Sequence, residues 1–292
     1  MGGRERVEMK LRILNLGAGV QSTAVALMVH RGELPPIDAA VFADVGEEPS
    51  SVYLHLKWLI HEVSPSFPVH LVTNGRLGDA LVVGRKWRKG HTTIPAFTLG
   101  PDSIGQVRRQ CTGDYKIEPV ERFIRRELLG VKPRCRVPKG TNVTQLFGLS
   151  YEEMGRAHRV TKSFHNTGRA SFSTPAFPLI DRMMKRGDCL KWLSDYGVPH
   201  PVERSACVFC PYKSNREWQR LKLHDPDGWN RAVEIDGLLR VASSKQAFGM
   251  KNPQFLHRDC VPIGEIDFST AEERGDQGTM GFYGECQGMC GT

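Results

Sequence analysis

The sequence of 292 residues lacks the long apolar runs that mark membrane and exported proteins. No run approaches the roughly 18–20 apolar residues that a transmembrane helix needs, and Met1–Lys10 is polar, with no apolar signal core. Internal repeats and low-complexity tracts are also missing. A composition of 40% hydrophobic and 25% charged residues is typical of a globular chain and not of a disordered one. We therefore expect a cytoplasmic protein with no membrane partner.

Short apolar strands alternate with helices over the first 200 residues. This order predicts an α/β fold, a parallel twisted sheet with helices on both faces. Beyond it the sequence changes to cysteine-containing loops and a Gly-rich tail, so we expect an α/β domain at 1–200 and a cysteine-containing extension at 201–292. Strands are predicted at 12–16, 39–43, 69–72 and 145–149, an extended segment at 176–180, and helices at 21–30, 50–63, 116–129, 188–196, 215–223 and 229–243, with no clear period at 85–110.

A loop of small residues, Gly17–Thr23, joins the first predicted strand to the first predicted helix. Small residues let the backbone approach a phosphate closely, and the free amides of a helix start favour an anion. Neither the Gly-Lys-Ser/Thr ending of a Walker loop nor the pattern Gly-x-Gly-x-x-Gly is present. The alternative is a tight turn that binds no ligand. On the functional interpretation the phosphate-binding residues are Gly17, Ala18, Gly19, Gln21, Ser22 and Thr23.

Asp44 follows the second predicted strand directly. The carboxyl ends of parallel strands share one edge of a sheet, where α/β proteins bind their ligands. Asp44 is therefore predicted to hold a ribose hydroxyl or Mg²⁺, and the alternative is a carboxylate that stabilises the turn.

Eight cysteines occur in a chain that we expect to stay reduced, which points to metal binding or catalysis more than to disulfides. Cys207 and Cys210 form a C-x-x-C pair that could hold a metal or a cluster. Cys111 lies in a cationic setting, and Cys286 and Cys290 form C-x-x-x-C near the end. Zinc and a thioredoxin-like redox pair are the alternatives to a cluster.

The net charge of +8 is compatible with a polyanionic partner, because Lys and Arg displace counterions from phosphates. A cationic cleft for a small anionic substrate is the alternative. The charge alone does not favour one of these two partners over the other.

Taken in order, these motifs resemble those of the phosphoadenosine-phosphosulfate reductase-like family of PP-loop proteins, the adenine nucleotide α-hydrolase fold. The resemblance covers most of the chain from about Ile13, and it implies a nucleotide-binding domain at 1–200. The matching segments are Gly17–Ser22 for Ser-Gly-Gly-x-Asp-Ser, 42–46 for the Asp-Thr-Gly strand end, 111–119 for a cysteine pair before Lys-x-x-Pro, 148–156 for Gly-Ile-x-x-Asp-Glu-x-x-Arg, Cys207 and Cys210 for the second cysteine pair, and 285–288 for the Glu-Cys-Gly tail.

Three departures from the family pattern disfavour a sulfonucleotide reductase. Gln110-Cys111 replaces a cysteine pair, Gln21 replaces an aspartate, and the tail lacks Gly-x-His. They favour a sibling activity, in which ATP activates an acceptor with release of pyrophosphate and sulfur is then inserted. The acceptor that we expect is nucleic acid, DNA (phosphorothioation) before tRNA (thiolation).

The resemblance also implies roles for single residues. It gives Cys111, Cys207, Cys210 and Cys290 as ligands of an iron–sulfur cluster, expected to be [4Fe–4S], and Cys286 as the carrier of persulfide sulfur beside Asp44 in catalysis. ATP and Mg²⁺ are the expected cofactors, and a cysteine desulfurase is the expected sulfur donor. A thioredoxin-dependent sulfonucleotide reductase, a non-enzymatic metal-containing nucleic-acid-binding module, and a homo-oligomer remain open.

Overall fold

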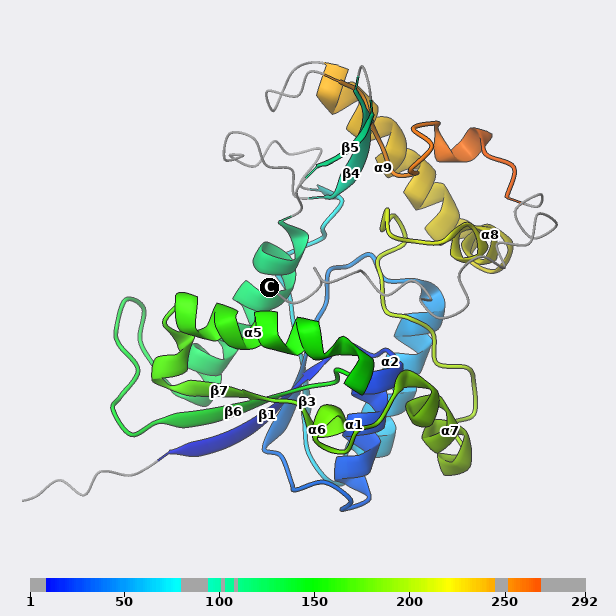
Figure 1. Cartoon of the computed structure of the whole chain (residues 1–292). Coiled ribbons are helices and arrows are strands. Elements are labelled where there is room, and N and C mark those ends of the chain that lie inside the picture. Colours follow the sequence, from blue (N-terminus) through cyan, green and yellow to red (C-terminus); the bar gives the residue numbers. More distant parts are fainter. Residues whose placement is uncertain (1–8, 80–93, 101–102, 108–109, 245–251, 269–292) are drawn as a thin grey trace, which may run out of the picture.

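The computed structural model describes residues 9–79, 94–100, 103–107, 110–244 and 252–268 (Figure 1). Its main sheet has five parallel strands in the order β3-β2-β1-β6-β7. These strands are β1 (Lys10–Leu16), β2 (Ala39–Ala43), β3 (Val69–Val72), β6 (Asn142–Phe147) and β7 (Ser173–Ala176). All five residues of β2 are buried, as expected for a strand covered on both faces. The predicted parallel α/β sheet is confirmed.

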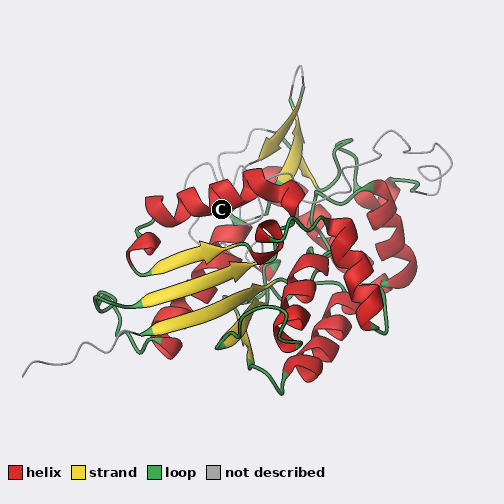
Figure 2. Ribbon diagram, turned by 60° about the horizontal axis from the view of Figure 1, so that its bottom comes forward, coloured by secondary structure: helices red, strands yellow, loops and turns green. Residues whose placement is uncertain are grey.

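Helices cover both faces of this sheet (Figure 2). One face packs on α1 (Val20–His30), α2 (Ser50–Val63), α6 (Pro178–Asp181) and α7 (Arg186–Tyr196). The other face packs on a continuous helix made of η1 (Gly113–Ile117), α4 (Glu118–Phe123) and η2 (Ile124–Leu128), and on α5 (Met154–Asn166), which lies between η3 (Tyr151–Glu153) and η4 (Arg169–Ser171). No helix in the described ranges is both long and apolar enough to cross a membrane.

A second core lies beside the carboxyl edge of the main sheet. Its antiparallel sheet has the order β5-β4-β8, and Trp218 and Phe209 are fully buried in it. Residues from both sides of position 200 form this second core, because its strands β4 and β5 come before that position and its remaining elements come after it. Its elements are β4 (Ala96–Leu99), β5 (Ile104–Val107), α8 (Asn215–His224), α9 (Pro226–Ser244), β8 (Gln254–Phe255) and η5 (Ile263–Glu265).

The extended segment predicted at 176–180 is wrong beyond its first residue. The chain leaves the sheet after Ala176, and α6 begins at Pro178, whose fixed φ suits the first turn of a helix. The strand predicted at 145–149 begins earlier, at Asn142. The stretch 85–110, which shows no period in the sequence, contains β4 and β5.

The buried carboxylate of Glu47 joins the two cores. Its Oε1 lies 2.8 Å from Nη2 of Arg231 in α9 and 3.0 Å from Nε of Arg76, and it accepts a hydrogen bond from the amide of Gly78. The carbonyl oxygen of Glu47 accepts a 2.7 Å hydrogen bond from the amide of Val208, inside the C-x-x-C segment. Through these contacts Glu47 holds the second core against the end of β2. Loss of one partner would leave a buried charge uncompensated, which is strongly destabilising.

A chain of hydrogen bonds crosses the core between α1 and α2. The Thr23 hydroxyl lies 2.9 Å from Nε2 of His55, and Nδ1 of His55 lies 2.9 Å from Nε2 of His200. His55 also stacks on Trp58. Burial, with a smaller contribution from His200, lowers the pKa of His55 from 6.5 to about 4, so the ring is neutral in the folded protein at pH 7.

The neutral state of His55 predicts a loss of stability in mild acid. The unfolded chain protonates this ring near pH 6.5 and the folded chain only near pH 4, so its contribution is complete above pH 6.5 and is lost as the pH falls toward 4. Between pH 7 and pH 5 we expect wild type to lose about 1–2 kcal/mol more free energy of unfolding than His55→Gln does. Urea unfolding at both pH values measures this, with His61→Gln, an exposed histidine of the same helix, as the control. An equal loss in wild type and His55→Gln would contradict the assignment.

Candidate functional site

The main cavity, of about 280 Å³, opens at the carboxyl ends of β1, β2 and β6. Strands β1 and β6 are neighbours, but the chain leaves them toward opposite edges of the sheet. Such a switch in strand order leaves a crevice at the strand ends, which is where open α/β sheets bind their ligands. The cavity therefore occupies the position that the fold class predicts for a ligand.

The loop after β1 is folded around the hydroxyl of Ser22. Oγ of Ser22 accepts hydrogen bonds from the amides of Gly17 (3.2 Å) and Gly19 (3.3 Å), and it donates one to the carbonyl oxygen of Gly19. Two backbone amides thus converge on one oxygen at the start of α1, as they do around a bound anion. Ala18 has a φ of +55°, in the left-handed region that suits glycine better, so the turn holds backbone strain.

Gly148, at the end of β6, lies against this loop. A Cβ placed on Gly148 would lie 2.6 Å from the backbone nitrogen of Ser22 and 2.7 Å from its Cα. Only glycine fits there without movement of the backbone, so the loop is held by its contact with the neighbouring strand.

Four of the six predicted phosphate-binding residues line the cavity, namely Gly17, Gly19, Gln21 and Ser22. Ala18 and Thr23 are not among the lining residues. The Thr23 side chain is fully buried and points to His55. Gln21 bridges two elements, because its Nε2 donates to Glu153 and its Oε1 accepts from Nη1 of Arg186.

Asp44 lies just past β2, at the predicted edge. Its Oδ1 accepts hydrogen bonds from the Gly46 amide and the Tyr53 hydroxyl, both 2.8 Å long. Burial, together with this bond, raises the pKa of Tyr53. One oxygen of Asp44 thus performs the turn-stabilising role, and Oδ2 has no hydrogen bond from the described part of the chain. The predicted role toward ribose or Mg²⁺ stays a prediction.

Cys111, Cys207 and Cys210 line the same cavity as the phosphate loop. The thiol of Cys207 is hydrogen-bonded to Cys210, and the amide of Cys210 bonds to the carbonyl oxygen of Cys207, which closes a tight turn. The bond to Cys210, burial, and the charges of Cys210, Cys111 and Glu48 raise the pKa of Cys207 well above its usual value. Within the described ranges, no three His, Cys, Asp or Glu side chains are grouped so that they could hold one metal ion.

The remaining cysteines differ in their surroundings. Burial, with smaller effects of nearby charges, raises the pKa of Cys189 to about 12, so this buried thiol stays protonated at pH 7. Cys135 is exposed and Cys260 is buried. Cys286 and Cys290 lie outside the described residues, so their predicted roles stay predictions.

Cationic side chains gather around the cavity. Five contribute to its lining, against the two carboxylates of Glu121 and Glu153, which suits an anionic ligand. The sequence analysis missed three of the five. Arg169 lies in the short turn η4, Arg204 lies in a loop, and Arg186 begins the distant helix α7. The five are Lys116, Arg156, Arg169, Arg186 and Arg204.

A polar network also forms part of the cavity wall. Asn15 in β1 donates to Gln145 in β6, and Gln145 donates to Glu121, whose carboxylate pairs with Arg169 at 3.2 Å. Gln145 is buried between Val143 and Phe147, the apolar residues two positions before and after it on the same face of β6. This mismatch between residue type and strand pattern is the one signal in the sequence that could have identified the network.

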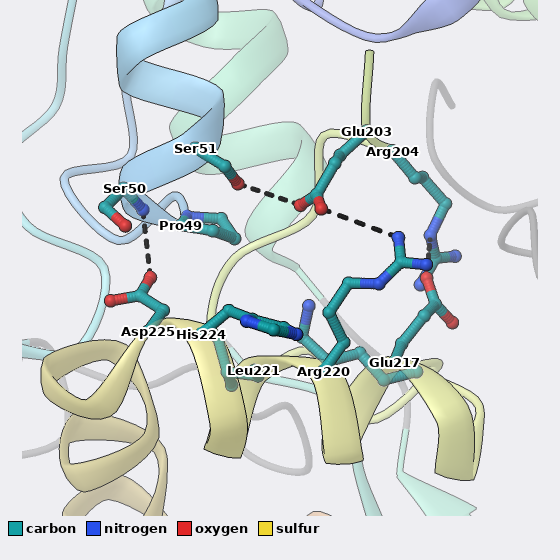
Figure 3. Close-up of a pocket in the computed structure, with 11 residues that line it drawn as sticks. Pro49, Ser50, Ser51, Glu203, Arg204, Glu217, Arg220, Leu221, His224 and Asp225 are labelled. Carbon is teal, nitrogen blue, oxygen red and sulfur yellow. Dashed lines mark hydrogen bonds and ion pairs between the residues drawn. The ribbon is translucent and has the colours of Figure 1, made fainter. Parts of the chain in front are cut away.

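A second cavity, of about 100 Å³, lies between the start of α2 and α8 (Figure 3). Its polar groups bind one another: the Ser50 amide donates to Asp225, the Ser51 hydroxyl donates to Glu203, and Glu203 pairs with Arg220. These contacts connect the two cores. Because the polar groups of the smaller cavity already bind one another, the larger cavity is the candidate site.

The fit of Gly148 against Ser22 predicts different effects for two glycine substitutions. Gly148→Ala should lower the free energy of unfolding by roughly 1–3 kcal/mol, because the new methyl group overlaps backbone atoms. Gly187→Ala, in α7, meets no atom within 4 Å and should be neutral or stabilising by up to about 1 kcal/mol. Urea unfolding of both variants measures the difference. Equal stability of the two would show that the loop does not depend on Gly148.

Comparison with known proteins assigns no family to this arrangement. No family model, curated protein or solved structure matches the chain.

Proposed function

We propose that the chain is an ATP pyrophosphatase that holds an iron–sulfur cluster and serves sulfur transfer to nucleic acid, with DNA favoured over tRNA as the acceptor. One observation carries the proposal: the phosphate-loop residues and three cysteines line a single cavity. A nucleotide in the loop and a thiolate-bound group would thus face each other across a short space. The alternative, a tight turn that binds no ligand, gives no reason for the cysteines to lie beside the loop.

The nucleotide would enter with its phosphates at the loop. The amides of Gly17 and Gly19 already point at one oxygen, that of Ser22, and a phosphate oxygen can take hydrogen bonds from the same region. Arg156 and Arg186 supply positive charge on the cavity wall. Mg²⁺, bound with the phosphates, would neutralise part of their charge, and Oδ2 of Asp44 is the carboxylate oxygen proposed for ribose or this ion.

The proposed reaction has two steps. An oxygen of the acceptor attacks the α-phosphorus of ATP, the bond to the β-phosphate oxygen breaks, and pyrophosphate leaves. The terminal sulfur of a persulfide on Cys286 then displaces AMP from the adenylated acceptor. A second thiol, external or on the chain, cleaves the remaining S–S bond and becomes part of a disulfide. The sulfur donor proposed for recharging Cys286 is a cysteine desulfurase of the cytoplasm.

The cysteines fit a cluster in part. Cys111, Cys207 and Cys210 provide three soft thiolate donors on one wall, and Cys290 is the proposed fourth. Each thiolate of a cluster binds a different iron, so its ligands converge less closely than those of a single ion. The bond to Cys210 and burial raise the pKa of Cys207 most, and the smaller effect of the negative charges of Cys210, Cys111 and Glu48 is the part that a bound cation would offset. A cluster with these four ligands would leave no iron open to sulfur, so in this proposal the transferred sulfur is carried by Cys286.

The first test concerns the phosphate loop. Ser22→Ala removes the oxygen on which the two loop amides converge, and we expect it to weaken ATP binding by roughly 1–2 kcal/mol. Calorimetry with ATP measures the affinity, and Ser64→Ala, at an exposed serine just after α2, is the control. Wild type should also release pyrophosphate from ATP in the presence of acceptor. Unchanged affinity of Ser22→Ala would reduce the loop to a turn, and release of sulfite with thioredoxin instead of pyrophosphate would favour a sulfonucleotide reductase.

The second test concerns the cysteines. Protein purified without oxygen should contain iron and sulfide, and Cys207→Ser should lose most of both, because a hydroxyl is a poor ligand for the cluster. Cys135→Ser, at an exposed cysteine away from the cavity lining, should keep both. Metal analysis of the three proteins is the measurement. Zinc without iron in wild type would refute the cluster.

A further inference from the structure

The positive charge of the chain is concentrated between residues 128 and 180. This span contains eight Lys and Arg residues and only two acidic residues, Glu152 and Glu153. It therefore accounts for six of the eight net charges of the whole chain. No acidic residue occurs from Met154 to Ile180, a stretch that includes all of α5.

Helix α5 has two distinct faces. Ala157, Val160 and Phe164 are buried and belong to a core cluster that joins the helix to the sheet. The opposite face exposes Arg159 and Lys162 together with two histidines, and Figure 1 shows α5 on the outside of the sheet. Neither Arg159 nor Lys162 forms an ion pair with a carboxylate of the described chain, whereas most cations around the cavity have one.

The basic face leads from the cavity to the far edge of the sheet. Arg156, in the first turn of α5, lines the cavity. The helix then runs for about 20 Å, from 13 residues at 1.5 Å each, toward the start of β7. Val143 of β6 pairs with Ser173 of β7, so the loop that precedes β6 lies at this same edge. That loop exposes four more cations, Lys132, Arg134, Arg136 and Lys139.

We propose that the outer face of α5 and the loop 130–141 form the docking surface for the phosphate backbone of duplex DNA. An exposed row of cations without carboxylate partners is what a polyanionic backbone complements. Single strands are usually held by stacking of bases on aromatic side chains, and α5 contains no Tyr or Trp and a single Phe, Phe164, which is buried. The inference rests on the proposed function only in its choice of nucleic acid as the partner, and it adds where the acceptor lies: along α5, with the cavity at one end.

The test is DNA binding by the full chain without ATP. The probe is a fluorescent duplex of 30 base pairs, followed by anisotropy over a series of salt concentrations. Arg159→Ala and Lys162→Ala should each weaken binding roughly 3–10-fold at fixed salt and lower the slope of log affinity against log salt by about one. Lys57→Ala, at an exposed lysine of α2 on the opposite face of the sheet, should change neither. Circular dichroism checks that all three variants fold.

Several outcomes would overturn this surface. These are unchanged affinity in both α5 variants, an equal loss in Lys57→Ala, tighter binding of a single strand of the same length, or binding of phosphatidylserine vesicles in place of DNA. Pyrophosphate release separates the two proposals, because Arg159 and Lys162 do not line the cavity. Wild type that binds DNA through α5 but never releases pyrophosphate would refute the proposed function alone. Wild type that releases pyrophosphate but shows no role of α5 would refute the docking surface alone.

Discussion

The structure depends on a carboxylate that is almost fully buried between two cores. Glu47 follows β2, yet its side chain binds Arg231 of α9 and its carbonyl oxygen holds the turn between Cys207 and Cys210. Burial of a carboxylate is costly unless it is fully paired, and here a guanidinium and a backbone amide share one oxygen. Because of this residue, the cysteine turn faces the phosphate loop and the two parts of the chain enclose one cavity.

The phosphate loop also gives a structural reason for one departure from the pattern that the sequence resembles. Gln21 replaces an aspartate, and its amide both donates and accepts, which lets it connect Glu153 to Arg186. A carboxylate there could accept from Arg186 but would repel Glu153. The substitution therefore fits the residues around it.

Residues that directly follow a strand could be located from the sequence, because the carboxyl ends of all parallel strands lie at the same edge of the sheet. Gly17 and Asp44 belong to this class, whereas Gly148 lies inside the strand predicted at 145–149 and follows β6 only in the structure. The sequence also indicated that Cys111 and the Cys207–Cys210 pair lie together, through their order along a resembled family. It could not locate Arg186 or Arg204, because no local pattern ties a single arginine to a cavity formed by distant segments. Strands β4 and β5 were missed for a similar reason: each is only four residues long, and the core that contains Ala96 of β4 is completed by distant residues of α8 and α9.

The second core also constrains how the chain can be made. Phe97 of β4 pairs with Phe255 of β8, more than 150 residues later. At about 5–20 residues per second, a ribosome needs on the order of 10–30 s to bring the second partner out after the first. During that interval the edge of β4 that will pair with β8 is open and has no finished core to cover it, although the strands β1 to β3 and their helices have already emerged. The nascent chain thus spends its longest vulnerable period with this edge exposed, and a chaperone that protects strand edges has its natural target there.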